Sequence, residues 1–141
     1  MSTITIADIR TKGQAVAKAD AYIITSEAWA NVPYGKIFAR QGDIYLTKLG
    51  AVPKDAIAVE SYAQLAPGAT LGSRHCLDHL DGVRMYHLRQ STALDGPIIE
   101  TFRPVTITHP KHGDIVDIPA GAVIHVTYQR MYADELRRVV D

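Results

Sequence analysis

Histidine is the residue type with the clearest potential for chemistry in this chain. His75, His79 and His87 fall within thirteen positions, and His109 and His112 are three residues apart. Neutral imidazole is the commonest protein ligand for zinc, copper, iron and nickel. A metal site needs three or four such ligands in a fixed geometry. One hypothesis is therefore a metal-binding protein or small metal-dependent enzyme that uses His75, His109 and His112.

The same histidines also have a structural interpretation, which we favour. His109 and His112 flank a short polar turn, where the His109 ring can bond backbone groups of the turn. His75 and His79 would share a face only on a helix, and the sequence around them is weakly helical. We therefore expect no cofactor. The alternative is a transition metal such as zinc, with His79 or Asp114 as an additional ligand.

The other reactive side chains form no recognisable catalytic pattern. Cys76 follows His75 directly, but neighbouring residues of a strand point to opposite faces, so we do not expect a nucleophilic pair. Asp78 and Asp81 lie in or beside turns, where aspartate commonly bonds its own backbone. The chain has no glycine-rich phosphate-binding motif. These observations weigh against an enzymatic function.

Charge and composition limit the possible partners. Of 141 residues, fifteen are basic and fifteen acidic, so the formal net charge is zero. A neutral chain has no overall field that attracts nucleic acid or an anionic membrane, and little charge repulsion that opposes association. We find no apolar run of about 18 residues and no signal peptide, and Cys76 is the only cysteine. We therefore expect a protein of the host cytoplasm or of a virion, without internal disulfides.

Short β segments separated by turns dominate the sequence from residue 37 onward. In residues 104–130, three segments rich in β-branched residues (105–108, 115–118 and 122–128) alternate with turns that contain Pro and Gly. Such spacing is typical of compact antiparallel folds. We predict a mainly β domain over residues 37–141, an antiparallel β-sandwich or small β-barrel. Alternation predicts a core that includes Ile44, Leu46, Leu88, Val105, Ile107, Ile115, Ile118, Val123 and Val126.

Residues 1–36 differ in composition and are predicted to form an N-terminal arm that contains a helix. Apolar residues at helical spacing predict that helix over about residues 8–19, and a further short helical turn can begin at Ser26. A short C-terminal helix is predicted over residues 133–140, with acidic residues before arginines as the helix dipole favours. Asp81-Gly82 and Leu94-Asp95-Gly96-Pro97 predict hairpin turns.

A series of short motifs runs through residues 39–141. In order, they are Gln41-Gly42-Asp43, Pro104-Val105, Thr108-His109-Pro110-Lys111-His112-Gly113, Ile118-Pro119-Ala120-Gly121, Gln129-Arg130, Tyr132, Arg137-Arg138-Val139 and Asp141. By these motifs and their order, residues 39–141 resemble a family of small bacterial and phage β proteins of unassigned function. The chain departs from the family pattern at two positions. Ser73 replaces the first histidine of a Gly-His-x-His motif that ends at His75, and Met131 replaces an acidic residue.

These two departures from the family pattern make a catalytic or metal-binding function less expected for this chain. If the family pattern is a metal or acid–base site, this chain lacks two of its better candidates. Our first expectation is therefore a non-catalytic structural or interaction subunit of a larger assembly, such as a capsid decoration protein of a phage virion. The alternatives are the histidine metal protein and a phage-encoded inhibitor that binds a host protein. Expected partners are proteins, either further copies of the chain or capsid proteins, and neither a membrane nor nucleic acid.

Overall fold

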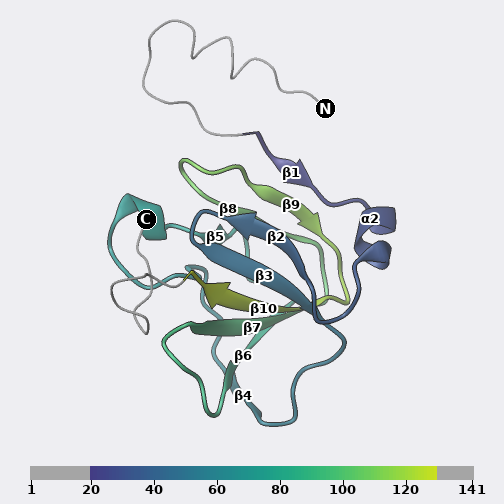
Figure 1. Cartoon of the computed structure of the whole chain (residues 1–141), viewed down its shortest axis with the longest axis vertical. Coiled ribbons are helices and arrows are strands. Elements are labelled where there is room, and N and C mark those ends of the chain that lie inside the picture. The colour runs from purple at the N-terminus through teal and green to yellow at the C-terminus, as the bar shows by residue number, and fades with distance from the viewer. Residues whose placement is uncertain (1–19, 130–141) are drawn as a thin grey trace, which may run out of the picture.

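The fold consists of two β-sheets (Figure 1). The structure is a computed structural model and describes residues 20–129. One sheet has four strands in the order β1-β9-β8-β5, and the other has six in the order β2-β3-β10-β7-β6-β4. The strands are β1 (Tyr22–Ile23), β2 (Ile37–Gln41), β3 (Ile44–Leu49), β4 (Ala56–Val59), β5 (Cys76–Leu77), β6 (Val83–Leu88), β7 (Asp95–Thr101), β8 (Val105–Thr108), β9 (Ile115–Ile118) and β10 (Val123–Tyr128). Within the described residues the sheets do not close into a barrel, so the predicted mainly β fold is a β-sandwich.

The core lies between the sheets, and in strands such as β3 it follows the alternation of the sequence. In β3, Ile44 and Leu46 are buried, whereas Tyr45 and Thr47, which follow each of them, are partly exposed. The prediction is confirmed for eight of the nine expected core residues, namely Ile44, Leu46, Val105, Ile107, Ile115, Ile118, Val123 and Val126. It is wrong for Leu88, which is only half-buried because it ends β6 opposite the outermost strand β4 and lines a surface cavity.

The predicted β run of residues 104–130 divides between the two sheets. Strands β8 and β9 pair antiparallel in the four-stranded sheet, whereas β10 lies between β3 and β7 in the other. The turn after β9 carries the chain across the sandwich. It is held by the buried Thr101 hydroxyl, which donates to the Pro119 carbonyl at 2.7 Å and accepts from the Ala122 amide at 3.0 Å.

The first predicted hairpin turn joins two sheets, whereas the second lies just after the loop (residues 89–94) of a hairpin that β6 and β7 do form. Gly82 does form a turn with positive φ, but β5 before it pairs with β8, while β6 after it pairs with β4 and β7. This turn therefore connects the two sheets. Gly96 lies inside β7, next to a register shift between β7 and β10. A Cβ atom at Gly96 would lie 2.7 Å from the Tyr128 hydroxyl, so close packing across the strands requires glycine there.

The described part of the N-terminal arm adds a strand and a short helix. Strand β1 pairs in parallel with β9, an arrangement that alternation alone did not predict. Helix α2 (Ser26–Asn31) confirms the short helix expected at Ser26, and the Thr25 hydroxyl caps it by accepting from the Ala28 amide at 3.0 Å. The helices predicted over residues 8–19 and 133–140 lie outside the described residues. No helix of the described chain is long and apolar enough to cross a membrane.

A buried lysine fastens α2 to the sandwich. Lys48 is only 6% exposed, and its ammonium group donates to the carbonyls of Trp29 and Val32 at 2.7 and 2.9 Å. These carbonyls lie at the C-terminal end of the helix, where a cation is favourable. The same ammonium group lies 4.7 Å from the Trp29 ring centroid and 5.0 Å from that of Tyr34. The lysine therefore compensates for its burial with hydrogen bonds and two aromatic faces.

Candidate functional site

Polar side chains from three distant segments meet inside the sandwich. Gln41 ends β2, and Gly42 and Asp43 form the two-residue loop that leads into β3. Gly42 has a φ of 57°, which a glycine adopts without strain at the first position of such a loop. The loop directs Gln41 and Asp43 inward, and they are only 2% and 1% exposed. His75, just before β5, is completely buried against them.

The hydrogen bonds of His75 define where its protons must lie. The Gln41 amide nitrogen donates to the carbonyls of Ile107 and Gly113 at 3.0 and 2.9 Å. The Gln41 oxygen is therefore the acceptor for His75 Nδ1, 2.8 Å away, and Nδ1 carries a hydrogen. On the other side of the ring, Nε2 lies 3.1 Å from the Asp43 carboxylate. These two atoms share one proton, so His75 and Asp43 form either an ion pair or a neutral acid–imidazole pair.

His109 holds the turn that follows β8. Its Nε2 donates to the Gly72 carbonyl at 3.0 Å, and its Nδ1 accepts from the backbone amides of Lys111 and His112 at 3.0 and 3.1 Å. One donor and one acceptor nitrogen define a neutral imidazole with its hydrogen on Nε2. The prediction that His109 bonds the backbone of its own turn is thus confirmed.

The three histidines predicted as metal ligands do lie together. Ring centroids are 4.4 Å apart for His75 and His109, 4.5 Å for His109 and His112, and 6.3 Å for His75 and His112. However, both ring nitrogens of His75 and of His109 already face hydrogen-bond partners. Within residues 20–129, no group of three His, Cys, Asp or Glu side chains is arranged to hold a metal ion. The metal site therefore stays a prediction without geometric support, and we assign it no chemistry.

The remaining residues considered in the sequence take separate positions around this cluster. The Asp114 carboxylate accepts from the His109 amide at 3.3 Å and so supports the same turn. His79 bonds the Pro104 carbonyl at 2.9 Å. Cys76 is partly exposed, and the ring nitrogens of His75 face Gln41 and Asp43. The His75 ring nitrogens are therefore directed at Gln41 and Asp43 and not at the Cys76 thiol.

Sequence reasoning about chemistry did not include Gln41 and Asp43, the two closest partners of His75. The available signal was the Gln-Gly-Asp motif of the resemblance, which contributes both residues. The cluster thus joins two of the motifs that carry the resemblance, Gln41-Gly42-Asp43 and the His109–Gly113 turn, through His75. Gln41, Asp43, His75 and His109 are buried, and each bonds another of these side chains or nearby backbone, which is the arrangement of a structural polar core.

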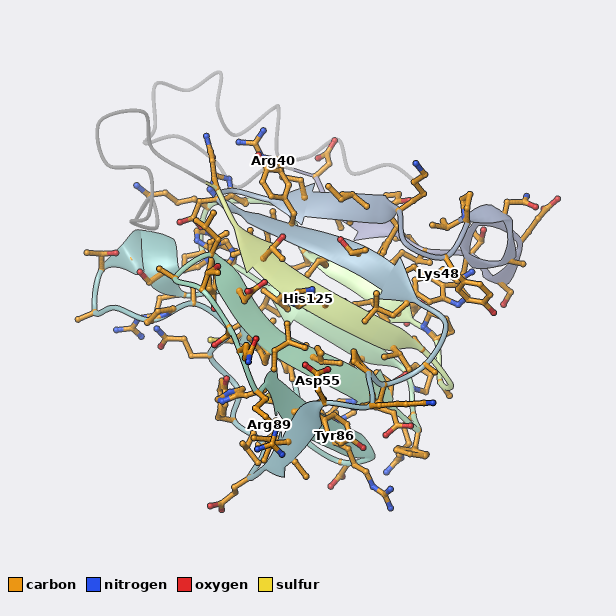
Figure 2. All side chains as sticks on the ribbon, turned by 60° about the horizontal axis from the view of Figure 1, so that its bottom comes forward. Arg40, Lys48, Asp55, Tyr86, Arg89 and His125 are labelled. Carbon is orange, nitrogen blue, oxygen red and sulfur yellow. The ribbon has the colours of Figure 1, made fainter. Side chains whose placement is uncertain are left out.

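His125 forms a second titratable site on the other face of the six-stranded sheet (Figure 2). Its Nε2 lies 3.4 Å from the Asp95 carboxylate, and the two side chains are 17% and 21% exposed. Burial lowers the pKa of His125 below its ordinary value, and the charge of Asp95 opposes that shift without cancelling it.

The lowered pKa of His125 predicts a loss of stability in mild acid. Below the ordinary histidine pKa of about 6.5, the unfolded chain binds a proton at His125 more readily than the folded chain does. The free energy of unfolding should therefore fall as the pH drops from about 7.5 to about 5.5. His125→Gln should make this fall shallower, measured by urea unfolding at a series of pH values. An unchanged slope in the variant would contradict the assignment.

The fold and cluster define the chain as a β-sandwich protein with a buried Gln–His–Asp core. A family model described as a domain of unknown function (DUF8820) matches residues 40–129. This match covers more than half of the chain, which therefore belongs to that family. No curated protein and no solved structure shows a significant match.

The ends of the matched region meet in space. Arg40, its first residue, donates to the Gln129 side-chain oxygen at 3.1 Å, and the Gln129 amide donates to the Asp43 carbonyl at 2.9 Å. The buried cluster lies within the same region. Hydrogen bonds thus join the beginning and the end of the segment that the family model matches.

Proposed function

We propose that the chain is a non-catalytic structural or interaction subunit of a larger assembly. One observation carries this proposal: three of the four outermost strands present a large exposed apolar side chain. These are Ile23 in β1, Ile37 in β2 and Ile57 in β4, which are 53%, 57% and 42% exposed. Outermost strands have unpaired backbone groups and are usually protected by charged side chains. Exposed isoleucines there favour pairing or packing against another protein.

The burial of the polar cluster also supports a non-catalytic role. Gln41, Asp43, His75 and His109 are at most 2% exposed and bond one another or nearby backbone. At that exposure the four side chains offer almost no surface to a substrate, although His109 borders a surface hollow that Gly72, Lys111 and His112 also line. The residues with the greatest catalytic potential therefore stabilise the sandwich, while the strands at its edges remain for contacts with partners.

Within this class we propose a phage virion accessory, such as a capsid decoration protein, that acts as a homo-oligomer or bound to capsid proteins. The resemblance to small bacterial and phage proteins, the N-terminal arm and the zero net charge motivate this finer assignment. The alternative, an inhibitor of a host protein, would also bind its partner through these strands. Unlike a virion accessory, it would need neither to form oligomers nor to bind virions.

Light scattering after size-exclusion chromatography tests the assembly role. We expect the full chain to form oligomers, or to co-sediment with purified capsids of its own phage. Three variants, Ile23→Lys, Ile37→Lys and Ile57→Lys, each test one outermost strand. The variant in the strand that contacts the partner should weaken the association at least about tenfold, because a buried apolar contact becomes a desolvated charge. Leu71→Lys is the matched control, since Leu71 is 52% exposed but lies in the short helix η1 (Leu71–Ser73) and in none of the outermost strands.

Two results would overturn the proposal. One is a monodisperse monomer that binds neither itself nor capsids. The other is association that survives all three strand substitutions, because the exposed isoleucines would then have no part in it. Circular dichroism of each variant distinguishes loss of association from loss of folding.

A further inference from the structure

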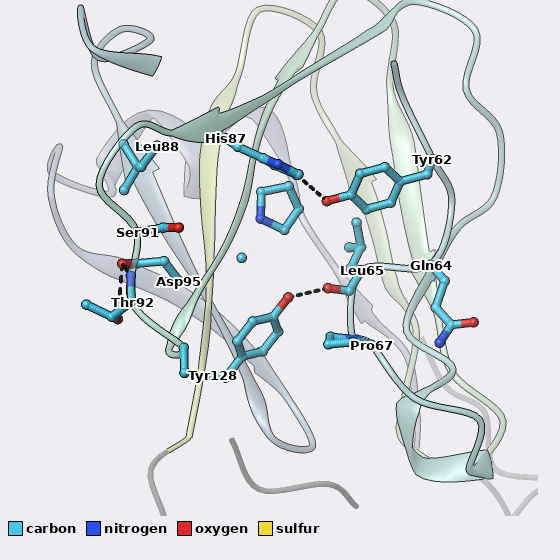
Figure 3. A pocket seen from close by; sticks show the side chains of 13 residues that line it. Tyr62, Gln64, Leu65, Pro67, His87, Leu88, Ser91, Thr92, Asp95 and Tyr128 are labelled. Carbon is cyan, nitrogen blue, oxygen red and sulfur yellow. Dashed lines mark hydrogen bonds between the residues drawn. The ribbon is translucent and has the colours of Figure 1, made fainter. Parts of the chain in front are cut away.

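A cavity of about 430 Å³ opens beside the end of β6, away from the histidine cluster (Figure 3). It lies between residues 62–67, the end of β6 with the following turn, the beginning of β7, and Tyr128 of β10. The register shift between β7 and β10 borders it, and Gly96 leaves room for Tyr128 there. Cavities that bind small molecules typically measure about 300–1,000 Å³. The size is therefore suited to a small organic ligand.

The cavity walls combine apolar and aromatic surface with hydrogen-bond acceptors. Leu65, Leu88 and Pro97 contribute apolar surface, and Tyr62 and Tyr128 contribute rings. The Tyr128 hydroxyl donates its hydrogen to the Leu65 carbonyl at 2.6 Å. That hydroxyl can therefore meet a ligand only as an acceptor.

The second tyrosine is fixed in a similar way. The Tyr62 hydroxyl lies 2.7 Å from His87 Nε2, which sets the orientation of both rings (Figure 3). Burial raises the pKa of Tyr62, so the phenol stays neutral at physiological pH. The ring faces are thus available to a ligand without an anionic phenolate beside them.

One carboxylate gives the cavity its charge. Among the thirteen described residues that line it, Asp95 is the only one with a formal charge at neutral pH, and none is Lys or Arg. The Asp95 carboxylate is positioned by the Thr92 amide and hydroxyl, which donate to Oδ2 at 2.9 and 3.2 Å. A fixed carboxylate near aromatic rings attracts a cation and repels an anion. The charge of the cavity thus selects against phosphates and carboxylic acids.

We propose that this cavity binds a small organic amine. The ammonium group lies at Asp95, and the apolar part of the ligand packs against Leu65, Leu88 and the tyrosine rings. This site is independent of the assembly role, since it includes none of the exposed isoleucines of the outermost strands. A chain that proves to be monomeric could still bind the amine, so the two proposals can fail separately.

Three matched probes test the ligand class on the full chain by calorimetry or saturation-transfer NMR. Benzylamine carries a cation, benzyl alcohol is its neutral counterpart, and benzoate carries an anion. We expect benzylamine to bind at least about fivefold more tightly than benzyl alcohol, which corresponds to about 1 kcal/mol, and benzoate to bind most weakly. Equal affinities for the three probes, or no binding of benzylamine at millimolar concentration, would overturn the proposal.

Variants locate the site. Asp95→Asn should reduce benzylamine affinity to the level of benzyl alcohol, because asparagine keeps an acceptor for Thr92 but removes the charge. Asp81→Asn is the matched control, since the Asp81 side chain is 81% exposed and pairs with Arg103 outside the cavity. Ser91→Phe at the rim should block all three probes without altering the core. Unchanged benzylamine binding in Asp95→Asn or in Ser91→Phe would place the amine elsewhere.

Discussion

Asp43→Ala is expected to destabilise the protein by about 3–5 kcal/mol, the usual cost of removing one partner from a buried charged or strongly polar pair. The Asp43 side chain is 1% exposed and lies 3.1 Å from Nε2 of the completely buried His75. Without the carboxylate, that nitrogen is left buried and without this hydrogen-bond partner. The free energy of unfolding, measured with denaturant and followed by the fluorescence of Trp29, the only tryptophan, gives the value directly.

Two further variants make the Asp43 prediction specific. Asp81→Ala is the control, because its ion pair with Arg103 is at the surface and should contribute at most about 1 kcal/mol. The double variant Asp43→Ala/His75→Ala should cost less than the sum of the two single variants, because the two side chains interact directly. A loss below about 1 kcal/mol in Asp43→Ala would show that the buried cluster does not hold the sandwich together.

Ile107→Ala is expected to cost about 2–5 kcal/mol, from lost burial of apolar surface and from the cavity left behind. Ile107 is 0% exposed and lies in β8, between β9 and β5. Its carbonyl accepts a hydrogen bond from the Gln41 amide, so the same residue borders the polar cluster. Denaturant unfolding of the variant, compared with the unchanged protein, measures the loss.

The matched control for Ile107→Ala makes the same substitution on the surface. Ile57 in β4 is 42% exposed, so Ile57→Ala should change stability by less than about 1 kcal/mol. Equal losses for the two variants would mean that the burial assigned to β8 is wrong. A larger loss for Ile57→Ala in concentrated than in dilute protein would indicate that β4 is covered by a partner.

The core of the fold was predictable because burial follows local alternation. Ile44 and Leu46, or Val105 and Ile107, are placed on the inner face by their own strand patterns, whatever strand lies beside them. The turn role of His109 was predictable for a similar reason, since its backbone partners, Lys111 and His112, are two and three residues away. Leu88 failed because its burial depends on β4 and the adjacent cavity, which its own strand pattern does not specify.

The pairing of strands was not predictable from turns alone. Asp81-Gly82 has the composition of a hairpin turn, yet β5 and β6 belong to different sheets. A turn motif fixes the backbone over a few residues, whereas the choice of partner strand depends on which arrangement buries the most apolar surface. For the same reason, the parallel pairing of β1 with β9 has no signal in the short sequence Tyr22-Ile23.

The class of fold, eight of the nine expected core residues and the set of histidines with potential for chemistry could be predicted from the sequence alone. Each of these depends on residue type and on spacing over a few positions. Only the tertiary structure decided what the histidines do. Gln41 and His75 are 34 residues apart, and Gln41 and Gly113 are 72 apart, so folding alone brings them within hydrogen-bond distance. Once there, the ring nitrogens of His75 face protein partners, and for that physical reason a predicted metal ligand serves as part of a buried polar core.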